Sequence, residues 1–257
     1  MKRFFRNFIP LKMNFSGTVR KSVAAAAVLA AAVLCGCGMA FQKSGRQGLP
    51  ADTAGAGIPA GLKAGDRLAF GAWEQDNDPD NGPEPIEWQV LAVEDGRALL
   101  LSEYALEARP YNETYRNVTW GGCTLRAWLN GEFFNTAFSS PEQARVSEVK
   151  NKNPKNPYAG TRGGSPTKDR VFLLDLAEAD KYFTDDASRQ CEATAYAKAR
   201  GAYVADDGNS WWWLRSPGSI GRTASIVLYG GYAAGTGYSV ADPSNTVRPA
   251  LWLSVGF

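Results

Sequence analysis

Five carboxylates are the residues of this chain whose chemistry comes closest to that of a catalytic site. An enzyme that cleaves glycosidic bonds needs two acidic side chains, one as proton donor and one as base or nucleophile. The candidates are Asp169, Asp175, Glu178, Asp206 and Asp207. No spacing singles out one pair among them, and acidic side chains are mostly exposed in any protein. A carboxylate-dependent hydrolase therefore stays an alternative, and the preferred interpretation is a protein that is not an enzyme.

The chain contains no histidine. This absence removes the Ser–His and Cys–His nucleophile pairs, the histidine-based metal sites and the commonest general base. The 28 basic and 26 acidic residues leave a net charge of only +2, and the densest basic run lies at the N-terminus. Binding to nucleic acid needs a basic patch or stripe, so no nucleic-acid partner is expected.

The acidic segment 76–87 resembles a calcium-binding loop. Oxygen-bearing side chains alternate from Asp76, and Glu87 stands at the twelfth position, as in an EF-hand loop. However, Gly82 comes one position late, and three prolines between positions 79 and 85 are incompatible with the loop and with the helix that should follow it. We expect a solvated acidic turn, with no metal site and no cofactor.

The N-terminus has the pattern of an export signal. Basic residues precede an unbroken apolar run, Val23 to Leu34, which is shorter than the roughly 20 residues that a membrane-spanning helix needs. The run ends in Leu-Cys-Gly-Cys, which resembles the bacterial lipobox, so residues 1–36 are predicted to be a lipoprotein signal peptide. Cys37 would carry the lipid and anchor the exported protein in the bacterial cell envelope. An ordinary signal peptide with incidental cysteines is the alternative, and the true start is Met1 or Met13.

Residues 37–64 are rich in Gly, Ala, Gln and Ser and have no hydrophobic period, which predicts a flexible tether. The folded domain is then expected over residues 65–257. It holds Cys123 and Cys191, which could form a disulfide in an exported protein or remain two buried thiols. The sequence leaves both possibilities open, because it does not give the distance between their Cα atoms.

The two ends of this domain have strand patterns, and its middle has helical patterns. Residues 65–71, 86–93 and 97–102 are expected strands, with a hairpin turn at Asp95-Gly96. Helices are expected over 124–130, over 141–149 after a Ser140 cap, after an Asp175 cap and over 187–200. Residues 151–168 are expected to form a long exposed loop, and 171–174 a short strand. The order predicts an α+β fold, with a mixed, mostly antiparallel sheet, flanking helices and a loop-rich C-terminal half.

The segment 211–257 begins with three adjacent tryptophans and ends with the apolar block 247–253. Trp212 and Trp252 are interpreted as structural, because such tryptophans are usually part of the core. Arg215 and Arg248 each lie beside a proline near an apolar block, and they are expected to be buried, paired anchors.

Between these blocks, residues 223–229 and a run ending near Val240 predict a ribbon with a turn at Gly230-Gly231. Ala224, Val227 and Val240 are expected to point inward. The composition of Tyr, Ser and Gly is typical of binding loops, and a glycine-rich hairpin that covers the core is the alternative. The candidate ligand-binding residues are Ser219, Ile220, Arg222, Ile226, Leu228, Tyr232, Ala234, Thr236, Tyr238 and Ser239.

Several phrases of the sequence resemble a family of bacterial exported domains of unknown function. They are PIEWQVL (85–91), CTLRAWLN (123–130), VFLLDLAEADKYF (171–183), CEATAYAKARGA (191–202), WWLRSPG (212–218) and VRPALWL (247–253). The C-terminal part is also similar to the C-type-lectin-like variable proteins of diversity-generating retroelements. Formylglycine-generating enzymes share that fold, but the chain lacks an obvious counterpart to their reactive cysteines.

This resemblance implies a C-type-lectin-like fold over 65–257. It also implies non-catalytic binding of an extracellular protein or glycan through a surface at 219–242, which is diversified in the retroelement proteins. A purely structural surface module is a further alternative to both the binding protein and the hydrolase.

The lipoprotein interpretation predicts that Cys37→Ser abolishes incorporation of a labelled lipid precursor in cells, because this thiol is the acceptor. Cys35→Ser is the control, and it should leave incorporation intact, since Cys35 departs with the signal peptide. Undiminished labelling of the Cys37→Ser protein would contradict the lipid anchor.

Overall fold

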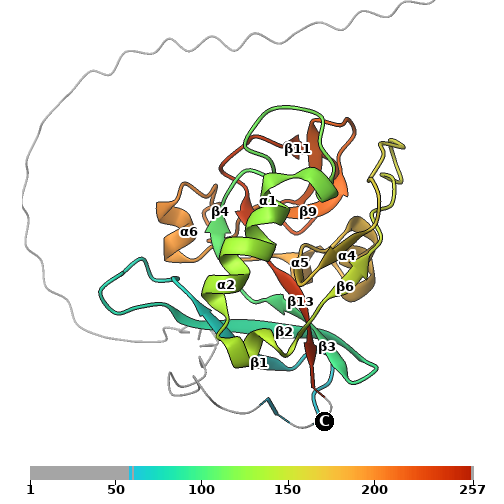
Figure 1. Ribbon diagram of the computed structural model, residues 1–257. Coiled ribbons are helices and arrows are strands. Elements are labelled where there is room, and N and C mark those ends of the chain that lie inside the picture. Colours follow the sequence, from blue (N-terminus) through green and yellow to red (C-terminus); the bar gives the residue numbers. More distant parts are fainter. Residues whose placement is uncertain (1–57, 60, 256–257) are drawn as a thin grey trace, which may run out of the picture. The chain divides into compact units, whose positions relative to one another are not determined.

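The C-terminal strand of the chain lies inside a six-stranded sheet, next to the third of the first three strands (Figure 1). The structure is a computed structural model that describes residues 58–59 and 61–255. The strands of this first sheet are β1 (Arg67–Trp73), β2 (Glu84–Glu94), β3 (Arg97–Ser102), β13 (Ala250–Ser254), β5 (Val146–Ser147) and β8 (Val171–Phe172). All neighbours are antiparallel, and β5 and β8 share the outer edge of β13. The last strand therefore holds the first hairpin to the middle of the chain.

The turn between β2 and β3 confirms the hairpin predicted at Asp95-Gly96. The backbone φ angles are 50° at Asp95 and 70° at Gly96. Positive φ at both central residues is the requirement of a type I′ turn, and Asp-Gly meets that requirement with little strain.

The second sheet comes almost wholly from the C-terminal half. In spatial order its strands are β11 (Ala233–Ser239), β10 (Thr223–Val227), β9 (Trp212–Pro217), β12 (Thr246–Val247) and β4 (Glu107–Ala108). The strands β9 and β12 run parallel, and the other pairs are antiparallel. A small antiparallel sheet joins β6 (Val149–Asn151) to β7 (Thr167–Asp169). The α+β class with mixed, mostly antiparallel sheets is confirmed.

The helices are short. They are η1 (Trp120–Gly122), α1 (Thr124–Trp128), the π-turn η2 (Leu129–Phe133), α2 (Phe134–Ala137), α3 (Ser140–Gln143), α4 (Leu176–Tyr182), α5 (Asp186–Arg189) and α6 (Ala195–Ala199). The predicted helix at 124–130 is present as α1 and the turn that continues it. The predicted cap of α4 is also confirmed, because the Asp175 carboxylate accepts the backbone N–H of Glu178 at 2.8 Å.

Two predicted helices are wrong in extent. The cap of α3 is Ser139, and the helix ends at Gln143, because the chain then pairs with β13 through β5. The predicted helix 187–200 is two helices, α5 and α6. The residues between them leave the helical path because Glu192 and Thr194 exchange backbone hydrogen bonds with Ala105 instead.

The segment 151–168 is less exposed than its composition predicts. The side chains of Asn151, Asn153 and Asn156 are buried. The amide of Asn156 donates to the carbonyl oxygens of Pro217 and Gly235, at 2.8 and 2.7 Å. The two N–H groups of this one amide replace backbone donors, and they connect the loop to β9 and β11.

The tryptophans that begin β9 belong to the core. Trp212 and Trp213 are both fully buried. Since consecutive residues of a strand point to opposite faces, this strand is covered on both sides. Trp212 is therefore structural as predicted, whereas Trp252 is only partly buried.

The prediction of buried arginine anchors is confirmed for Arg215, which forms ion pairs with Asp175 and Glu178. Arg248 is equally buried but bonds to backbone instead. Its guanidinium donates to the carbonyl oxygens of Ser102 and Arg189 and lies 5.2 Å from the ring of Trp212.

The predicted signal peptide, Cys37 and most of the predicted tether lie outside the described residues. Within the residues that are described, no helix is long and apolar enough to cross a membrane.

Cys123 and Cys191 are both buried free thiols, so the structure supports that alternative over the disulfide. Burial raises the pKa of the Cys123 thiol to about 12 and that of Cys191 to about 11. Both thiols are protonated at neutral pH, and a protonated, buried thiol is a poor nucleophile.

We predict that iodoacetamide at pH 8 leaves Cys123 and Cys191 unmodified in the folded protein and modifies both in denaturant. Peptide mass spectrometry reads out each cysteine separately. Labelling that appears in denaturant only after a reductant is added would show a disulfide and contradict the buried thiols.

Candidate functional site

Four aromatic side chains form a continuous patch at the border of the second sheet, next to the loops that pack over its strands. The ring centroids of Tyr203 and Trp211 are 4.4 Å apart, those of Trp211 and Tyr238 are 5.3 Å apart, and those of Tyr203 and Tyr229 are 6.3 Å apart. Between 39% and 43% of each tyrosine is exposed, and Trp211 between them is partly buried. We call these four residues the aromatic surface.

Three members of the aromatic surface lie in or next to strands of the second sheet, and the fourth, Tyr203, lies in a loop. Trp211 precedes β9, and its carbonyl oxygen accepts the backbone N–H of Thr246 at 2.8 Å. Tyr238 lies in β11, and Tyr229 follows β10. Tyr203 belongs to the loop after α6. The backbone N–H of Tyr203 donates to the carbonyl oxygen of Ser244 at 2.9 Å. The patch is therefore held by backbone hydrogen bonds.

The position of the patch follows from how β9 is covered. The ring of Trp213 packs against that of Tyr111, with centroids 5.7 Å apart, and Tyr111 in turn packs against Trp120. Trp211, two residues before Trp213, points to the same side of the sheet. The segment that includes Tyr111 and η1 covers Trp213 and stops short of Trp211, so the outer rings stay accessible.

The ten candidate binding residues do not form one surface. Ile226 and Ala234 are buried, at 1% and 8% exposed, so the expectation that they lie on an exposed face is wrong. They face each other across β10 and β11, on the side of Trp213. The inward placement of Ala224, Val227 and Val240 is confirmed. The strand β10 is thus buried on both faces, as in a sheet with a layer on each side.

The exposed candidates divide between two turns and β11. Ser219, Ile220 and Arg222 are exposed in the β9–β10 turn, where the guanidinium of Arg222 lies 5.0 Å from the ring of Tyr115. Tyr232 is 60% exposed in the β10–β11 turn. Among the other candidates, Thr236 and Tyr238 are exposed, and Leu228 and Ser239 are partly buried.

Only Tyr238 belongs to both the candidate set and the aromatic surface. The sequence reasoning did not place Tyr203 or Tyr229 at the site. Tyr203 is separated from Trp211 by the turn that carries Asp206 and Asp207, so no periodic pattern connects them.

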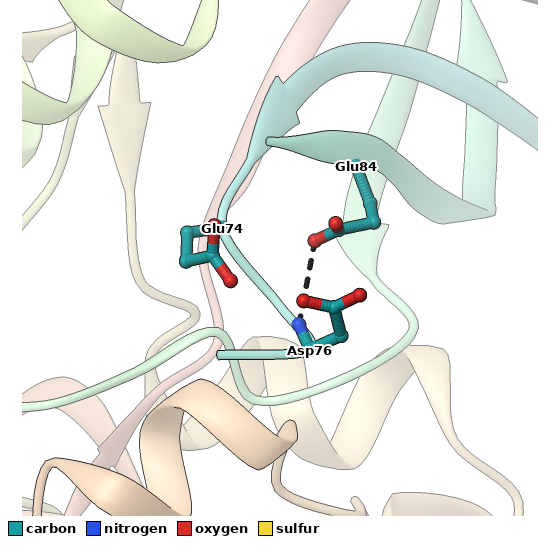
Figure 2. A group of neighbouring side chains, drawn as sticks. All are labelled: Glu74, Asp76 and Glu84. Atoms are coloured by element: carbon teal, nitrogen blue, oxygen red, sulfur yellow. Dashed lines mark hydrogen bonds between the residues drawn. The ribbon is translucent and has the colours of Figure 1, made fainter. Parts of the chain in front are cut away.

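The acidic turn after β1 is drawn in Figure 2. Oxygen atoms of Glu74, Asp76 and Glu84 lie within 4.8 Å of one another and could contact a cation. However, Glu84 accepts the backbone N–H groups of Gln75 and Asp76, at 2.7 and 3.3 Å. Hydrogen bonds from the Asn81 amide and the backbone N–H of Asp78 hold the pKa of Asp76 below its usual range. These hydrogen bonds within the turn explain why the three carboxylates lie close together without requiring a cation.

Glu87, the other end of the EF-hand pattern, lies in β2 opposite Ala69 and is not part of this group.

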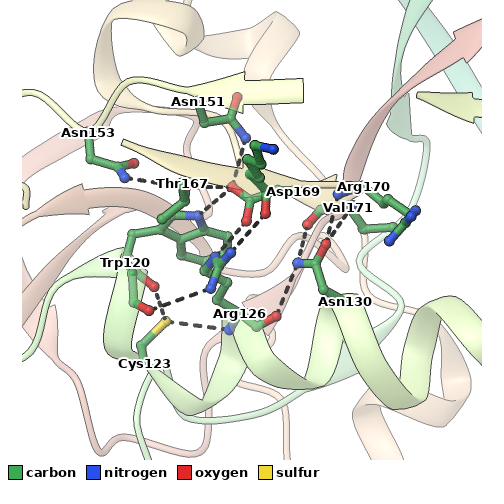
Figure 3. A network of polar contacts seen from close by, with 12 residues as sticks. Trp120, Cys123, Arg126, Asn130, Asn151, Asn153, Thr167, Asp169, Arg170 and Val171 are labelled. Atoms are coloured by element: carbon green, nitrogen blue, oxygen red, sulfur yellow. Dashed lines mark hydrogen bonds and ion pairs between the residues drawn. The ribbon is translucent and has the colours of Figure 1, made fainter. Parts of the chain in front are cut away.

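Asp169 is the centre of a buried polar network (Figure 3). Its carboxylate accepts the indole N–H of Trp120 at 3.1 Å, the amide of Asn151 at 2.9 Å and the hydroxyl of Thr167 at 2.7 Å. It also pairs with the guanidinium of Arg126, which joins β7 to α1. A carboxylate bound on all sides in this way has a structural role.

The other predicted carboxylates are also accounted for. Asp175 and Glu178 converge on the guanidinium of Arg215, and the two residues cap α4 reciprocally. Burial raises the pKa of Asp175, while the charge of Arg215 opposes that shift. Asp206 and Asp207 lie in an exposed turn, where Asp207 accepts hydrogen bonds from Asn209. Among these five residues, no two free carboxylates face each other across a cleft.

Comparison with known families gives one result. The chain matches a family described as a domain of unknown function, DUF6273, over residues 95–255. The chain belongs to this family. The match starts in the β2–β3 turn, so β1 and β2, which contain the phrase PIEWQVL, lie before the matched range. No curated protein and no solved structure matches the chain.

The ion pairs of Arg215 predict a large loss of stability when this residue is replaced. Arg215→Leu leaves Asp175 and Glu178 without their counter-charge, and losing one partner of a buried pair costs about 3–5 kcal/mol. Urea unfolding of the purified protein at pH 7 measures this loss. Arg170→Leu is the control, because Arg170 pairs with Glu148 at the surface and such a pair contributes at most about 1 kcal/mol. Equal losses for the two variants would contradict the anchoring role of Arg215.

Proposed function

We propose that this protein is a lipid-anchored protein of the bacterial cell envelope that binds an extracellular ligand without catalysis. In this proposal the domain is C-type-lectin-like, and the ligand is a protein or a glycan that contacts the aromatic surface. The single observation that carries the proposal is the contact of Tyr203, Trp211, Tyr229 and Tyr238 beside the second sheet, with the tyrosine rings exposed.

The physical support is the balance of rigidity and exposure. Tyrosine offers a large apolar ring with a polar hydroxyl, and fixing its two side-chain torsions costs little entropy. A set of exposed rings in contact with one another supports a binding role, since large apolar patches on a folded protein often mark binding sites. Tyr232 projects nearby in sequence, at the tip of the β10–β11 turn, and adds a more exposed ring to the same segment.

The finer parts of the proposal rest on the sequence. The phrases WWLRSPG and VRPALWL carry the resemblance to C-type-lectin-like variable proteins of diversity-generating retroelements. The buried positions of Trp212, Arg215 and Arg248 agree with a scaffold role for these two phrases. The export signal and Cys37 carry the proposed location in the envelope.

The preference for binding over hydrolysis rests on the carboxylates. Asp169, Asp175 and Glu178 are engaged in buried ion pairs and hydrogen bonds that hold the fold together. Using any of them as an acid or base would remove a structural contact.

The test is a binding screen of the purified full-length protein against glycan and surface-protein arrays. For any ligand found, the double variant Tyr229→Ala, Tyr238→Ala should weaken binding at least tenfold, which is the loss of about 1.4 kcal/mol typical of contact residues at a binding site. Tyr232→Ala is expected to have a smaller effect, because its ring has no aromatic neighbour within the described part of the chain.

Tyr158→Ala is the matched control. Tyr158 is 75% exposed, but its ring lies against Gly235, on the opposite side of β11 from Tyr238. Its replacement should leave affinity unchanged. Binding that survives the double variant would move the site elsewhere, and an absence of any ligand would favour a purely structural module.

A further inference from the structure

A small hollow lies beside the aromatic surface, between β4 and α1. It is an open depression of about 270 Å³, bordered by Arg109, Arg200, Glu113 and Thr124, with apolar walls that include Leu125 and Pro243. Pockets for drug-sized ligands span roughly 300–1,000 Å³. The hollow therefore has room for one small chemical unit of a larger ligand.

Arg109 is the distinctive group of this hollow. Its guanidinium lies 4.5 Å from the ring of Trp128. Its backbone is fixed on both sides, because its N–H donates to Asn245 at 3.1 Å and its carbonyl oxygen accepts the indole N–H of Trp213 at 2.8 Å. Arg109 has no ion pair among the described residues, and its buried Nε atom has no hydrogen-bond partner there. A stacked guanidinium held in this way is prepared for a planar anion.

The other polar groups limit which anion fits. Arg200 shares its charge with Glu107, whose carboxylate lies 3.4 Å from the Arg200 Nε atom. Glu113 is exposed at the rim. The hydroxyl oxygen of Thr124 accepts the N–H of Glu113 at 3.0 Å, which leaves the Thr124 hydroxyl hydrogen to donate to a ligand. Two nearby carboxylates disfavour a doubly charged phosphate, so a singly charged carboxylate suits the hollow better.

The hollow and the aromatic surface are neighbours on one side of the second sheet. Pro243 borders the hollow, and the next residue, Ser244, accepts the backbone N–H of Tyr203. Trp213, which bonds to Arg109, and Trp211 of the aromatic surface point to the same side of the sheet. The hollow and the aromatic surface are therefore connected through the Pro243-Ser244 segment.

We propose that this hollow binds the carboxylate of an acidic sugar, whose neighbouring sugar units contact the aromatic surface. The inference rests on the proposed function and narrows its ligand from any protein or glycan to a carboxylated glycan. The size of the hollow favours one sugar unit. The exposed rings provide flat contacts for the apolar faces of the sugars that follow.

The test is a titration of the purified full-length protein with glucuronate, followed by ligand-observed NMR. Glucose, inorganic phosphate and a glutamate-containing dipeptide are the comparison probes. We expect glucuronate to bind at least tenfold more tightly than glucose and more tightly than phosphate or the dipeptide. Equal binding of glucose, or tighter binding of phosphate or of the dipeptide, would overturn the inference.

Variants assign the binding to the hollow. Arg109→Gln should weaken glucuronate binding at least tenfold, and Arg109→Lys should weaken it less, because lysine keeps the charge but loses the planar fork. Arg97→Gln is the matched control, because this guanidinium also lies over a tryptophan, Trp252, but in the first sheet. The Arg97→Gln protein should bind glucuronate with the affinity of the unmodified protein. Thermal unfolding confirms that each variant is folded. An Arg109→Gln protein that binds normally would overturn the inference.

The outcomes separate this inference from the proposed function. A ligand whose binding depends on Tyr229 and Tyr238 but not on Arg109 would overturn the acidic-sugar inference and support the proposed function. Binding of an oligosaccharide that ends in glucuronate, if it depends on Arg109 but not on these tyrosines, would support the hollow and contradict the aromatic surface as the site.

Discussion

The buried guanidinium of Arg215 is the interaction on which the arrangement of this domain depends. It stands in β9 of the second sheet and donates to the carbonyl oxygen of Leu173, which directly follows β8 of the first sheet. It also binds Asp175 and Glu178, the residues that start α4. One side chain thus joins both sheets and a helix. Burying a charge is costly unless its partners are close, so these elements must meet at this position for the domain to fold.

This junction decides where a binding surface can form. Because both faces of β9 and β10 are covered, the strands that carry the most apolar residues have no exposed side. Within the described part of the chain, exposed rings that contact one another occur where the covering loops stop, at Trp211 and the tyrosines around it. The segment 212–217 is therefore scaffold, and the proposed binding surface lies at its borders. The same covering loops leave the hollow at Arg109, so both proposed contacts come from the incomplete coverage of one sheet face.

The polar chemistry of the domain is directed inward. Asp169, Asp175 and Glu178 were the natural candidates for acid–base chemistry, and each one instead compensates a buried or partly buried arginine. The domain contains few helical turns and many loops, and such networks replace regular secondary structure as the means of holding loops in place. Membership of the family DUF6273 assigns no activity. The proposed function rests on surface groups that lie outside this network.

The sequence by itself determined the local features, because these depend on neighbouring residues. Asp95-Gly96 specified its hairpin turn, Asp175 specified the start of α4, and Arg215 was recognisable as a buried anchor. The tertiary structure decided whatever depends on partners that are distant along the chain. The helix α3 ends at Gln143 because the following residues pair with β13 as β5, and Asn156 is buried against two strands.

The tertiary structure also decided the candidate site. Alternation along β10 suggested an exposed face at Ile226, but a second layer covers that face, and no pattern within a strand reports what packs against it. Tyr203, Trp211 and Tyr238 come from a loop, a strand border and an edge strand, so only folding brings their rings together.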